Sequence, residues 1–547
     1  MVADRWFIDW DINPRYPLLT RANAGEVLPD PVSPLGWTLT WTPMLQGWRE
    51  AGLYDFASME PEELSETHPE VVCLVGGHLY INGSSTRLFG VRGPGLTPEA
   101  IDQAYFGDHP DKPPYVPEPW HENATVSERM GAWMQGVMTA TDLPELRDDR
   151  ERSRAARASR PDLATLTDDQ LVARAHELAP LLRQLFRRHL AVTAGSSIGP
   201  GVLGAVAEAL GDPSLALTLI TSVGDVDSAA PSRAMWELSR LDPASAEYRE
   251  GFAAFIREFG SRGPNEWDIR SEVWETKPAL VTVLVDRMRG APDDESPMAR
   301  NDVNAAAREA ATARVREILA GQPDTLAQFE MGLASAHAYL AGRERTKTNV
   351  IRVLHEVRIV VRELAARHDY TMSEVCMLLE DELDAFVAGP DEFRPRLTAR
   401  EEQYLELFEL EPPFIVDGAA PPLSQWPRKG DVVVEAAAPG DVLAGVPGAP
   451  GVAEGRARVV LDPGDPFALE PGDVLVAPIT DPAWTPLFVP AVAVVVNVGA
   501  VVSHAIIVSR ELGIPCVVSV TDATRRIPDG AWVRVDGSTG TVTVLDG

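Results

Sequence analysis

Hydrophobic and polar positions divide the chain into a long helical part and a shorter part built from strands and tight turns. From about residue 164 to residue 410, apolar residues recur at the three- and four-residue spacing of amphipathic helices. Beyond residue 446, short Val-rich runs are separated by Gly and Pro, which is typical of strands joined by tight turns. The pattern predicts a multidomain protein with a mainly α-helical domain followed by a small α/β domain.

Two helices are marked most clearly. The first begins at a capping box formed by Thr167 and Gln170 and carries the apolar stripe Leu171, Ala175, Leu178, Leu182 and Leu185. The second lies within residues 343–367, and its stripe consists of Val350, Leu354, Val357, Val361 and Leu364. Arg343 and Lys347 sit one turn apart where this helix begins, so both cations are expected to point in the same direction.

The N-terminal part shows weaker periodicity. Residues 9–34 are rich in Pro and turn formers, whereas residues 70–90 alternate and break at Gly76-Gly77, which predicts a small hairpin embedded in the helical region. Asp9 and Asp11 form a D-x-D pair of the kind that can hold Mg²⁺. Two carboxylates in a loop are more often simply solvated, and we predict no metal site in this chain.

Residues 416–445 are rich in Ala, Pro and Gly and are interpreted as a hinge. Ten extended residues at 3.3–3.6 Å each would let the following domain travel about 35 Å. The expected organisation is therefore a mostly helical domain over residues 1–415, a linker over residues 416–445, and a compact α/β domain over residues 446–547.

Composition narrows the function classes. A formal net charge of −32 argues against a nucleic-acid partner, and three widely spaced cysteines offer neither a disulfide framework nor a CxxC metal site. The N-terminus has no secretory signal pattern, so a cytoplasmic location is expected. Residues 482–509 lack formal charge over a length that could cross a bilayer, but Pro490, Asn497 and Gly499 interrupt them, and no membrane association is predicted.

One histidine stands out by its position. An Ala/Val run over residues 491–496 predicts a buried strand, Gly499 breaks it, and Ser503 occupies the N-cap position of a short helix that ends at Gly513. His504 then lies at the positive end of that helix, where an anion such as a phosphoryl group is favoured, and a neutral imidazole is a competent nucleophile. The alternative is a structural histidine in a strand-to-helix turn.

The surrounding sequence carries a resemblance. SHAIIVSRELGIPCVV, preceded by PGVAEGRARVVLDP and GDVLVAPITDPAWTPLF and followed by VDGSTGTV, resembles the swivelling phosphohistidine domain of the phosphoenolpyruvate synthase, pyruvate phosphate dikinase and rifampicin phosphotransferase families. The resemblance implies that His504 accepts a phosphoryl group and carries it between two active sites. The chain departs from the motif at Ala500, where Gly is usual, and at Val502, where Thr is usual.

The same families suggest the residues around the phosphoryl group. The R-E-x-x-K pattern of Arg343 and Lys347 is similar to the rifampicin phosphotransferase pair that stabilises the transferred phosphoryl group opposite the histidine. Fixed positive charge stabilises the negative charge on the phosphoryl oxygens during transfer. Ser503 and Arg510 are expected to help stabilise the phosphoryl group. The alternative for Arg343 and Lys347 is a solvated basic face that pairs with nearby glutamates.

A second segment, FGSRGPNEWDIRSEVWETKP, is similar to a stretch of the central domains of these families, with Ser261 where His is usual. Arg262, Glu266 and Asp268 are candidates for a polar cluster at the domain junction. A buried salt-bridge network would explain the three residues equally well.

The resemblance implies an ATP-dependent phosphotransferase component. Residues 9–34 resemble the segment that follows the ATP-binding domain in these families, so we expect ATP and Mg²⁺ on a separate ATP-grasp protein, a split similar to that of phenylphosphate synthase. Without a pyruvate barrel after the phosphohistidine domain, the expected acceptor is a hydroxyl of an organic molecule bound by residues 1–415. Trp37, Trp41 and Trp48 either line its pocket or form a core.

Two other functions stay open at this point. A non-catalytic regulatory or scaffold homologue would keep the folds and lose turnover, as the changes at Ala500 and Val502 could indicate. A self-contained hydrolase is the least favoured, because the sequence contains neither a nucleophile elbow nor a metal triad.

Overall fold

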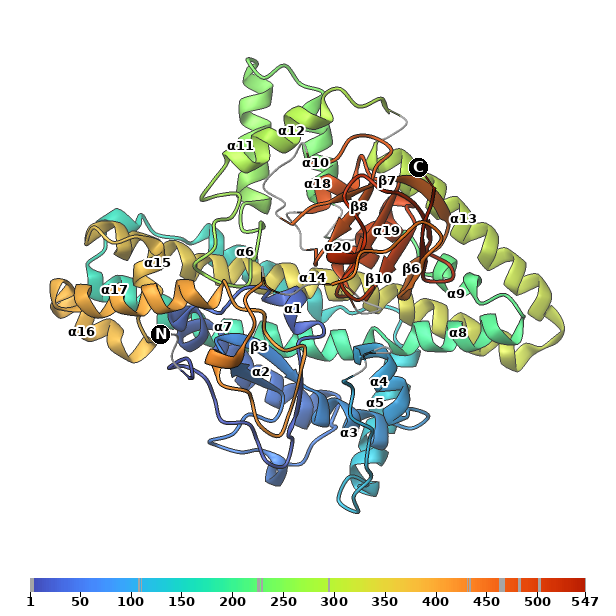
Figure 1. Cartoon of the computed structure of the whole chain (residues 1–547), viewed down its shortest axis with the longest axis horizontal. Coiled ribbons are helices and arrows are strands. Elements are labelled where there is room, and N and C mark those ends of the chain that lie inside the picture. The colour runs from blue at the N-terminus through green and yellow to red at the C-terminus, as the bar shows by residue number, and fades with distance from the viewer. Residues whose placement is uncertain are drawn as a thin grey trace.

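The computed structural model describes residues 4–106, 109, 111–223, 227, 230–293, 296–429, 431, 434–461, 468–480, 484–499 and 503–546. It consists of a long, mainly helical body and a compact α/β domain that lies against the middle of this body (Figure 1). The predicted order of a helical part followed by an α/β part agrees with this architecture.

Two long helices form the axis of the helical body. Helices α7 (Asp168–Gly195) and α14 (Pro323–Arg367) pack along each other. The predicted capping box of α7 is confirmed, because the N–H of Gln170 donates to Thr167 Oγ1 at 3.3 Å and the N–H of Thr167 donates to Gln170 Oε1 at 2.8 Å. The predicted stripe of α14 is also confirmed, since all five of its residues are buried in the core.

Shorter helices surround this pair, and α10 to α12 form a lobe that projects beside the α/β domain (Figure 1). Their bounds are α1 (Ala24–Val27), α2 (Thr42–Glu50), α3 (Gly83–Arg92), α4 (Pro98–Phe106), α5 (Ala124–Thr139), α6 (Glu145–Ala158), α8 (Ile198–Ala209), α9 (Ser214–Leu219), α10 (Ala230–Ser239), α11 (Ala246–Phe259), α12 (Ala279–Met288), α13 (Pro297–Ile318), α15 (Met372–Val375), α16 (Leu383–Ala388) and α17 (Pro390–Leu407). Of these, α2, α5, α6 and α8 pack on α7 or α14, and α10 packs on α11 and α12.

A small antiparallel sheet completes the helical body. Its strand order is β2-β3-β1-β4, with β1 at Leu18–Thr20, β2 at Val72–Val75, β3 at His78–Asn82 and β4 at Ile415–Asp417. The predicted hairpin is confirmed as β2 and β3, which are joined by Gly76 and Gly77, both at positive φ. Strand β4 returns from the far end of the body to pair with β1.

The C-terminal domain is built on one eight-stranded sheet of order β5-β12-β11-β7-β8-β9-β10-β6. Its strands are β5 (Val442–Ala444), β6 (Val446–Ala449), β7 (Val452–Val459), β8 (Val474–Ala477), β9 (Ala493–Val496), β10 (Cys516–Val518), β11 (Trp532–Asp536) and β12 (Thr541–Val544), and its helices are α18 (Thr485–Phe488), α19 (His504–Leu512) and α20 (Ala523–Arg526). Strands β7 to β10 run parallel. A separate hydrophobic core covers each face of the sheet, which explains the uninterrupted Ala/Val run of β9.

Both ends of the predicted linker belong to folded parts. Val416, Leu423 and Trp426 are buried in the core of the helical body, and β5 begins at Val442 in the sheet of the C-terminal domain. Residues 427–429 also pair with the helical body, and Ala437 and Gly440 bond to the C-terminal domain. The segment between the two parts, residues 430–436, would span about 25 Å if it were fully extended. A hinge in this segment stays a prediction, and its length is shorter than the sequence suggested.

Among the described helices, one stretch is long and apolar enough to cross a membrane. It is Asp168–Ala209, and 39% of its most apolar window is buried inside the protein. A core helix gives the same signal, and α7 buries Leu171, Leu182 and Leu185 against its neighbours. In its described part, the uncharged stretch 482–509 forms the short elements α18, β9 and the start of α19.

The close packing of α2 on α7 is testable at Gly47. A methyl group at this position would overlap the backbone of Arg183 in α7, so Gly47→Ala should destabilise the protein by about 1–3 kcal/mol through overpacking and lower the midpoint of thermal unfolding. Gly136→Ala in α5 is the control, because no heavy atom lies within 4 Å of the added methyl group and Ala is favoured in helices. Equal midpoints for the two variants would contradict the packing.

Candidate functional site

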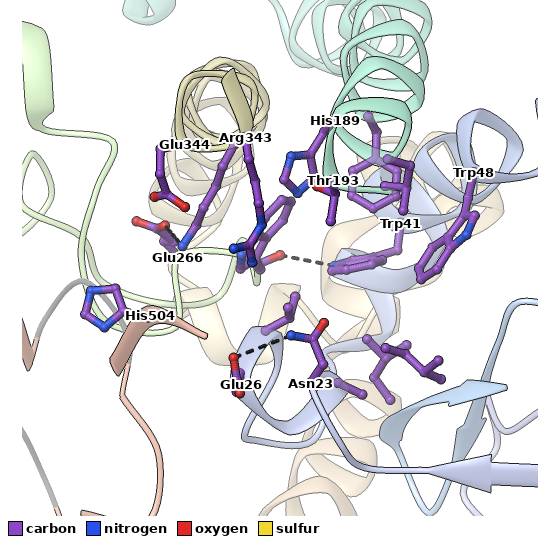
Figure 2. Close-up of a pocket in the computed structure, with 18 of the residues that line it drawn as sticks. Asn23, Glu26, Trp41, Trp48, His189, Thr193, Glu266, Arg343, Glu344 and His504 are labelled. Atoms are coloured by element: carbon purple, nitrogen blue, oxygen red, sulfur yellow. Dashed lines mark hydrogen bonds and ion pairs between the residues drawn. The ribbon is translucent and has the colours of Figure 1, made fainter. Parts of the chain in front are cut away.

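A cavity lies where the α/β domain meets the helical body. It encloses about 990 Å³ of space not filled by protein atoms, the part open to solvent included. Figure 2 shows that His504 lies at one end of the view and Trp41 and Trp48 at the other, with Arg343 and His189 between them. Elements far apart in sequence therefore meet around one space.

His504 is placed by a short, well-capped helix. It is the first residue of α19, whose N-cap Ser503 accepts the N–H of Ile506 at 3.5 Å, and Gly513 ends the helix in the left-handed region. The Nδ1 atom of His504 lies 3.2 Å from Thr480 Oγ1, and the ring of Phe488 packs edge-on at 5.9 Å. These contacts orient the imidazole towards the cavity.

The charge state of His504 follows from its surroundings. Burial lowers its pKa well below the ordinary value, and the nearby cations Lys347 and Arg262 lower it further. The imidazole is therefore neutral at physiological pH, as a nitrogen nucleophile must be.

Arg343 and Lys347 reach the same cavity from α14. The Nζ atom of Lys347 lies 3.4 Å from Glu266 Oε1, and Arg262 Nε donates to Glu266 Oε2 at 2.8 Å. Burial alone would raise the pKa of Glu266, but Arg262 and Lys347 lower it more, so the carboxylate stays charged. The predicted pair is thus not a solvated surface face; the ammonium of Lys347 is held in place by a buried ion-pair cluster.

The segment 259–278 therefore contains a salt-bridge network that also borders the cavity. Arg262 and Glu266 belong to it, and Glu266 lines the cavity. Asp268 has a different task, because its two carboxylate oxygens accept the N–H and the hydroxyl of Ser33 at 2.8 and 2.7 Å. Both sequence interpretations of this cluster hold in part.

Aromatic side chains line part of the cavity. Trp41, Trp48, Phe186 and Trp267 line the cavity, and Trp41 Nε1 donates to the carbonyl of Trp267 at 3.1 Å. Trp37 is buried behind Trp41, stacked on it at 6.2 Å. Of the three tryptophans considered from sequence, Trp41 and Trp48 line the cavity, and Trp37 and Trp41 belong to the hydrophobic core.

His189 is a cavity residue that the sequence interpretation missed. Its Nδ1 atom lies 3.0 Å from Thr346 Oγ1 of α14, and burial, together with Arg343 and Lys347, lowers its pKa to about 3. The available signal was its spacing: His189 follows Leu185 by four residues and Phe186 by three, so it continues the buried face of α7.

Ser503 and Arg510 are not among the residues that line the cavity. Arg510 Nε donates to the carbonyl of Gly448 at 2.8 Å, and burial lowers the pKa of this guanidinium to about 10. In this arrangement Arg510 fastens α19 to β6, and Ser503 caps α19. The two departures from the phosphohistidine motif, Ala500 and Val502, lie outside the described residues.

Among the residues that the structure describes, no group of three His, Cys, Asp or Glu side chains is arranged to hold a metal ion. The D-x-D pair has other partners: Asp9 accepts the backbone N–H groups of Trp6, Gly76 and Gly77, and Asp11 pairs with Arg5 at 2.6 Å.

The α/β domain is held in this arrangement by contacts away from the cavity. Asn304 Nδ2 of α13 donates to the carbonyls of Arg510 and Glu511 at 3.0 and 3.1 Å, at the C-terminal end of α19. Arg525 of α20 pairs with Glu411 at 2.7 Å. Burial of Glu511, whose carbonyl contacts Asn304, raises the pKa of its carboxyl group to about 7. Arg287 of α12 also donates to the carbonyl of Leu469.

Two family models match parts of the chain. Residues 469–540 match the PEP-utilising enzyme mobile domain, and residues 239–344 match the rifampicin phosphotransferase fourth domain. The first match contains α19 and His504, and the second ends at Glu344, at the cavity.

Curated relatives of the chain include members of the same families. A rifampicin phosphotransferase of Streptomyces sviceus is 30% identical over 327 residues, covering 56% of this chain and 36% of the relative. An uncharacterised protein of Mycobacterium tuberculosis is 26% identical over 590 residues, covering 98% of this chain and 62% of the relative. A phosphoenolpyruvate synthase of Aeropyrum pernix is 46% identical over 144 residues, covering 25% of this chain and 18% of the relative. The chain spans about a third of the rifampicin phosphotransferase it matches.

The buried neutral state of His189 predicts a pH effect on stability. At pH 5 an unfolded histidine, with a pKa near 6.5, is protonated, whereas His189 in the folded protein, with a pKa of about 3, is not. Stability contributed by this residue is therefore present above pH 6.5 and lost as the pH falls. Between pH 7.5 and pH 5, the wild type should lose about 2 kcal/mol more unfolding free energy than His189→Gln.

Chemical denaturation of the two proteins at both pH values measures this difference. His176→Gln is the control, because His176 lies on the same helix with a largely accessible side chain that faces Glu380. Equal pH dependence in the wild type and His189→Gln would show that His189 is protonated in the folded protein.

Proposed function

Because the chain belongs to the PEP-utilising enzyme superfamily, we propose that it is a phosphotransferase component in which His504 carries a phosphoryl group to a hydroxyl of an organic acceptor bound by the helical body. One observation carries the proposal. His504 and the Arg343–Lys347 pair come from different parts of the chain and line the same cavity. A histidine with only a structural role would need no such cations opposite it.

The chemistry divides a difficult transfer into two steps through a covalent intermediate. In the first step a P–O bond of the phosphoryl donor breaks as the imidazole nitrogen bonds to phosphorus, and the rest of the donor leaves. Since Nδ1 of His504 faces Thr480 Oγ1, we assign Nε2 as the nucleophile. In the second step the N–P bond breaks as the acceptor oxygen bonds to phosphorus. The transition state spreads negative charge over the phosphoryl oxygens, and Arg343 and Lys347 supply positive charge at that place.

The donor in this proposal is a separate ATP-grasp protein that binds ATP and Mg²⁺. In the arrangement described here, His504 faces the cavity of its own helical body, so loading requires a second arrangement in which the α/β domain has turned away. Residues 430–436 are the proposed hinge. Such a complex would work in the cytoplasm, where ATP is available.

The acceptor is proposed to be an organic molecule with an apolar or aromatic portion. Four aromatic residues, Trp41, Trp48, Phe186 and Trp267, line the cavity, as is common in sites for such molecules. Trp41 and Trp48 lie away from His504 (Figure 2). Several curated relatives are rifampicin phosphotransferases, which makes rifampicin the first acceptor to try.

Phosphate labelling tests the carrier role. The protein is incubated with Mg²⁺, ATP labelled in both its β- and γ-phosphoryl groups, and an active ATP-grasp protein. We expect an acid-labile, base-stable phosphate that maps to His504 and is lost in His504→Gln. His176→Gln should label like the wild type. No label on the wild type, with a partner shown to be active, would favour the alternative of a regulatory or scaffold homologue.

Charge removal at Lys347 separates the two steps. Lys347→Gln should leave loading of His504 intact, because loading takes place away from this cavity, and should slow discharge to the acceptor by about 10²–10³-fold. Arg262 still pairs with Glu266 in this variant. Single-turnover discharge of the labelled protein gives the rate. Arg362→Gln is the matched control, since Arg362 lies on the same helix and pairs with Glu272 at the surface; an equal loss in both variants would contradict the role of Lys347.

A further inference from the structure

The hydrogen bonds around His189 determine which of its ring nitrogens carries the proton. The hydroxyl of Thr346 donates to the carbonyl of Arg343 at 2.9 Å, one turn earlier in α14. A hydroxyl has one proton, so Thr346 Oγ1 can only accept at its 3.0 Å contact with His189 Nδ1. The proton of the neutral imidazole is therefore on Nδ1, and Nε2 presents a lone pair.

The position of the ring lets this lone pair accept a hydrogen bond from a molecule in the cavity. His189 lines the cavity together with Arg343, Lys347 and His504, and the rings of Phe186 and Trp267 pack against it, each at 5.9 Å. Thr346 is the hydrogen-bond partner that the described residues supply to this imidazole. The ring is thus fixed in orientation through Nδ1, and it borders the cavity. Its pKa of about 3 keeps it neutral at physiological pH.

We propose that His189 positions the acceptor: its Nε2 accepts a hydrogen bond from the acceptor hydroxyl and so turns an oxygen lone pair towards the phosphorus carried by His504. This inference rests on the proposed function and deepens it. Arg343 and Lys347 lie close enough to depress the pKa of His189, and Lys347 is also close enough to depress that of His504. The hydroxyl would therefore lie beside the same cations that hold the phosphoryl oxygens.

With His189 in this role, every bond and proton of the transfer step is accounted for. The P–N bond of phosphorylated His504, whose Nδ1 carries a proton, breaks and leaves a neutral imidazole. The O–P bond forms, and the hydroxyl proton moves along its hydrogen bond to His189 Nε2 and then to solvent. The transfer of this proton is late, because in a loose transition state the attacking oxygen carries little extra charge before the bond to phosphorus forms.

The same arrangement selects the chemical class of the acceptor. A lone pair at Nε2 attracts a group that donates a hydrogen bond and repels a carboxylate or a phosphate oxygen. The site is therefore built for a neutral alcohol or phenol, with the apolar part of the molecule against Trp41 and Trp48. Methylation of the accepting hydroxyl should abolish both transfer and this contact.

Discharge kinetics test the positioning role. Protein labelled on His504 is mixed with rifampicin, and loss of the label is followed for the wild type, His189→Phe and His189→Gln. We expect normal loading in all three, discharge about 10²-fold slower in His189→Phe, and recovery to within about tenfold of the wild type in His189→Gln, whose side-chain oxygen takes the place of Nε2. His176→Gln is the control on the same helix. Wild-type discharge by His189→Phe would overturn the proposal.

A second measurement does not depend on the acceptor or on phosphorylation. Nitrogen NMR of protein labelled with ¹⁵N in the histidine rings reports the protonation of each ring nitrogen, and His189→Gln assigns the signal. We expect a proton on Nδ1 and a bare Nε2 at pH 7 and at pH 5.5, with this preference lost in Thr346→Val. A proton on Nε2 would overturn the proposal even if His504 proves to be the phosphoryl carrier. The expected tautomer, in a protein that never labels, would leave the hydrogen-bond assignment standing and reject only the transfer.

Discussion

The structure depends on one buried ion-pair cluster. Glu266 accepts from Arg262 and lies 3.4 Å from the ammonium of Lys347, and all three groups are removed from most of the solvent. A buried carboxylate between two cations stays charged, and it fixes the position of Lys347 more firmly than a surface pair would. Burial lowers the pKa of His504, and the same cations lower it further. Charge in the helical body therefore adds to the effect of burial on a residue in the other domain.

This cluster also explains why the helical body is built around one very long helix. Helix α14 carries Arg343 and Lys347 towards the cavity, and its following turns are buried from Asn349 to Arg358. The neighbouring α7 brings His189 and Phe186 to the same place, and the segment after α11 brings Glu266. A cavity whose walls belong to a rigid core can be approached and left by a mobile domain without losing its geometry.

Much of this arrangement was predictable from sequence. The capping box of α7, the apolar stripe of α14 and the hairpin around Gly76 depend on local patterns, and each appears as predicted. His504 was found because a buried strand, an N-cap and a helix stop surround it within a few residues. Arg343 and Lys347 share one face of α14 because of helical spacing alone.

Other features depend on contacts that sequence spacing does not contain. Arg510 is near His504 in sequence, but its side chain points to Gly448 because α19 packs its far end on β6. His189 resembled an ordinary core residue until the fold placed it beside Thr346 of another helix. The return of β4 to β1 moved the start of the linker into the helical body. In each case tertiary packing, rather than local propensity, decided the outcome.

The central claim is that the α/β domain moves His504 between this cavity and a donor site elsewhere. Spin labels at the exposed residues Val303 of α13 and Val452 of β7 allow the distance between the two parts to be measured by pulsed electron resonance. The account predicts one narrow distance in the protein alone and a second, clearly different population when the ATP-grasp partner, Mg²⁺ and a non-hydrolysable ATP analogue are added. A single unchanged distance, with binding of the partner demonstrated, would contradict it.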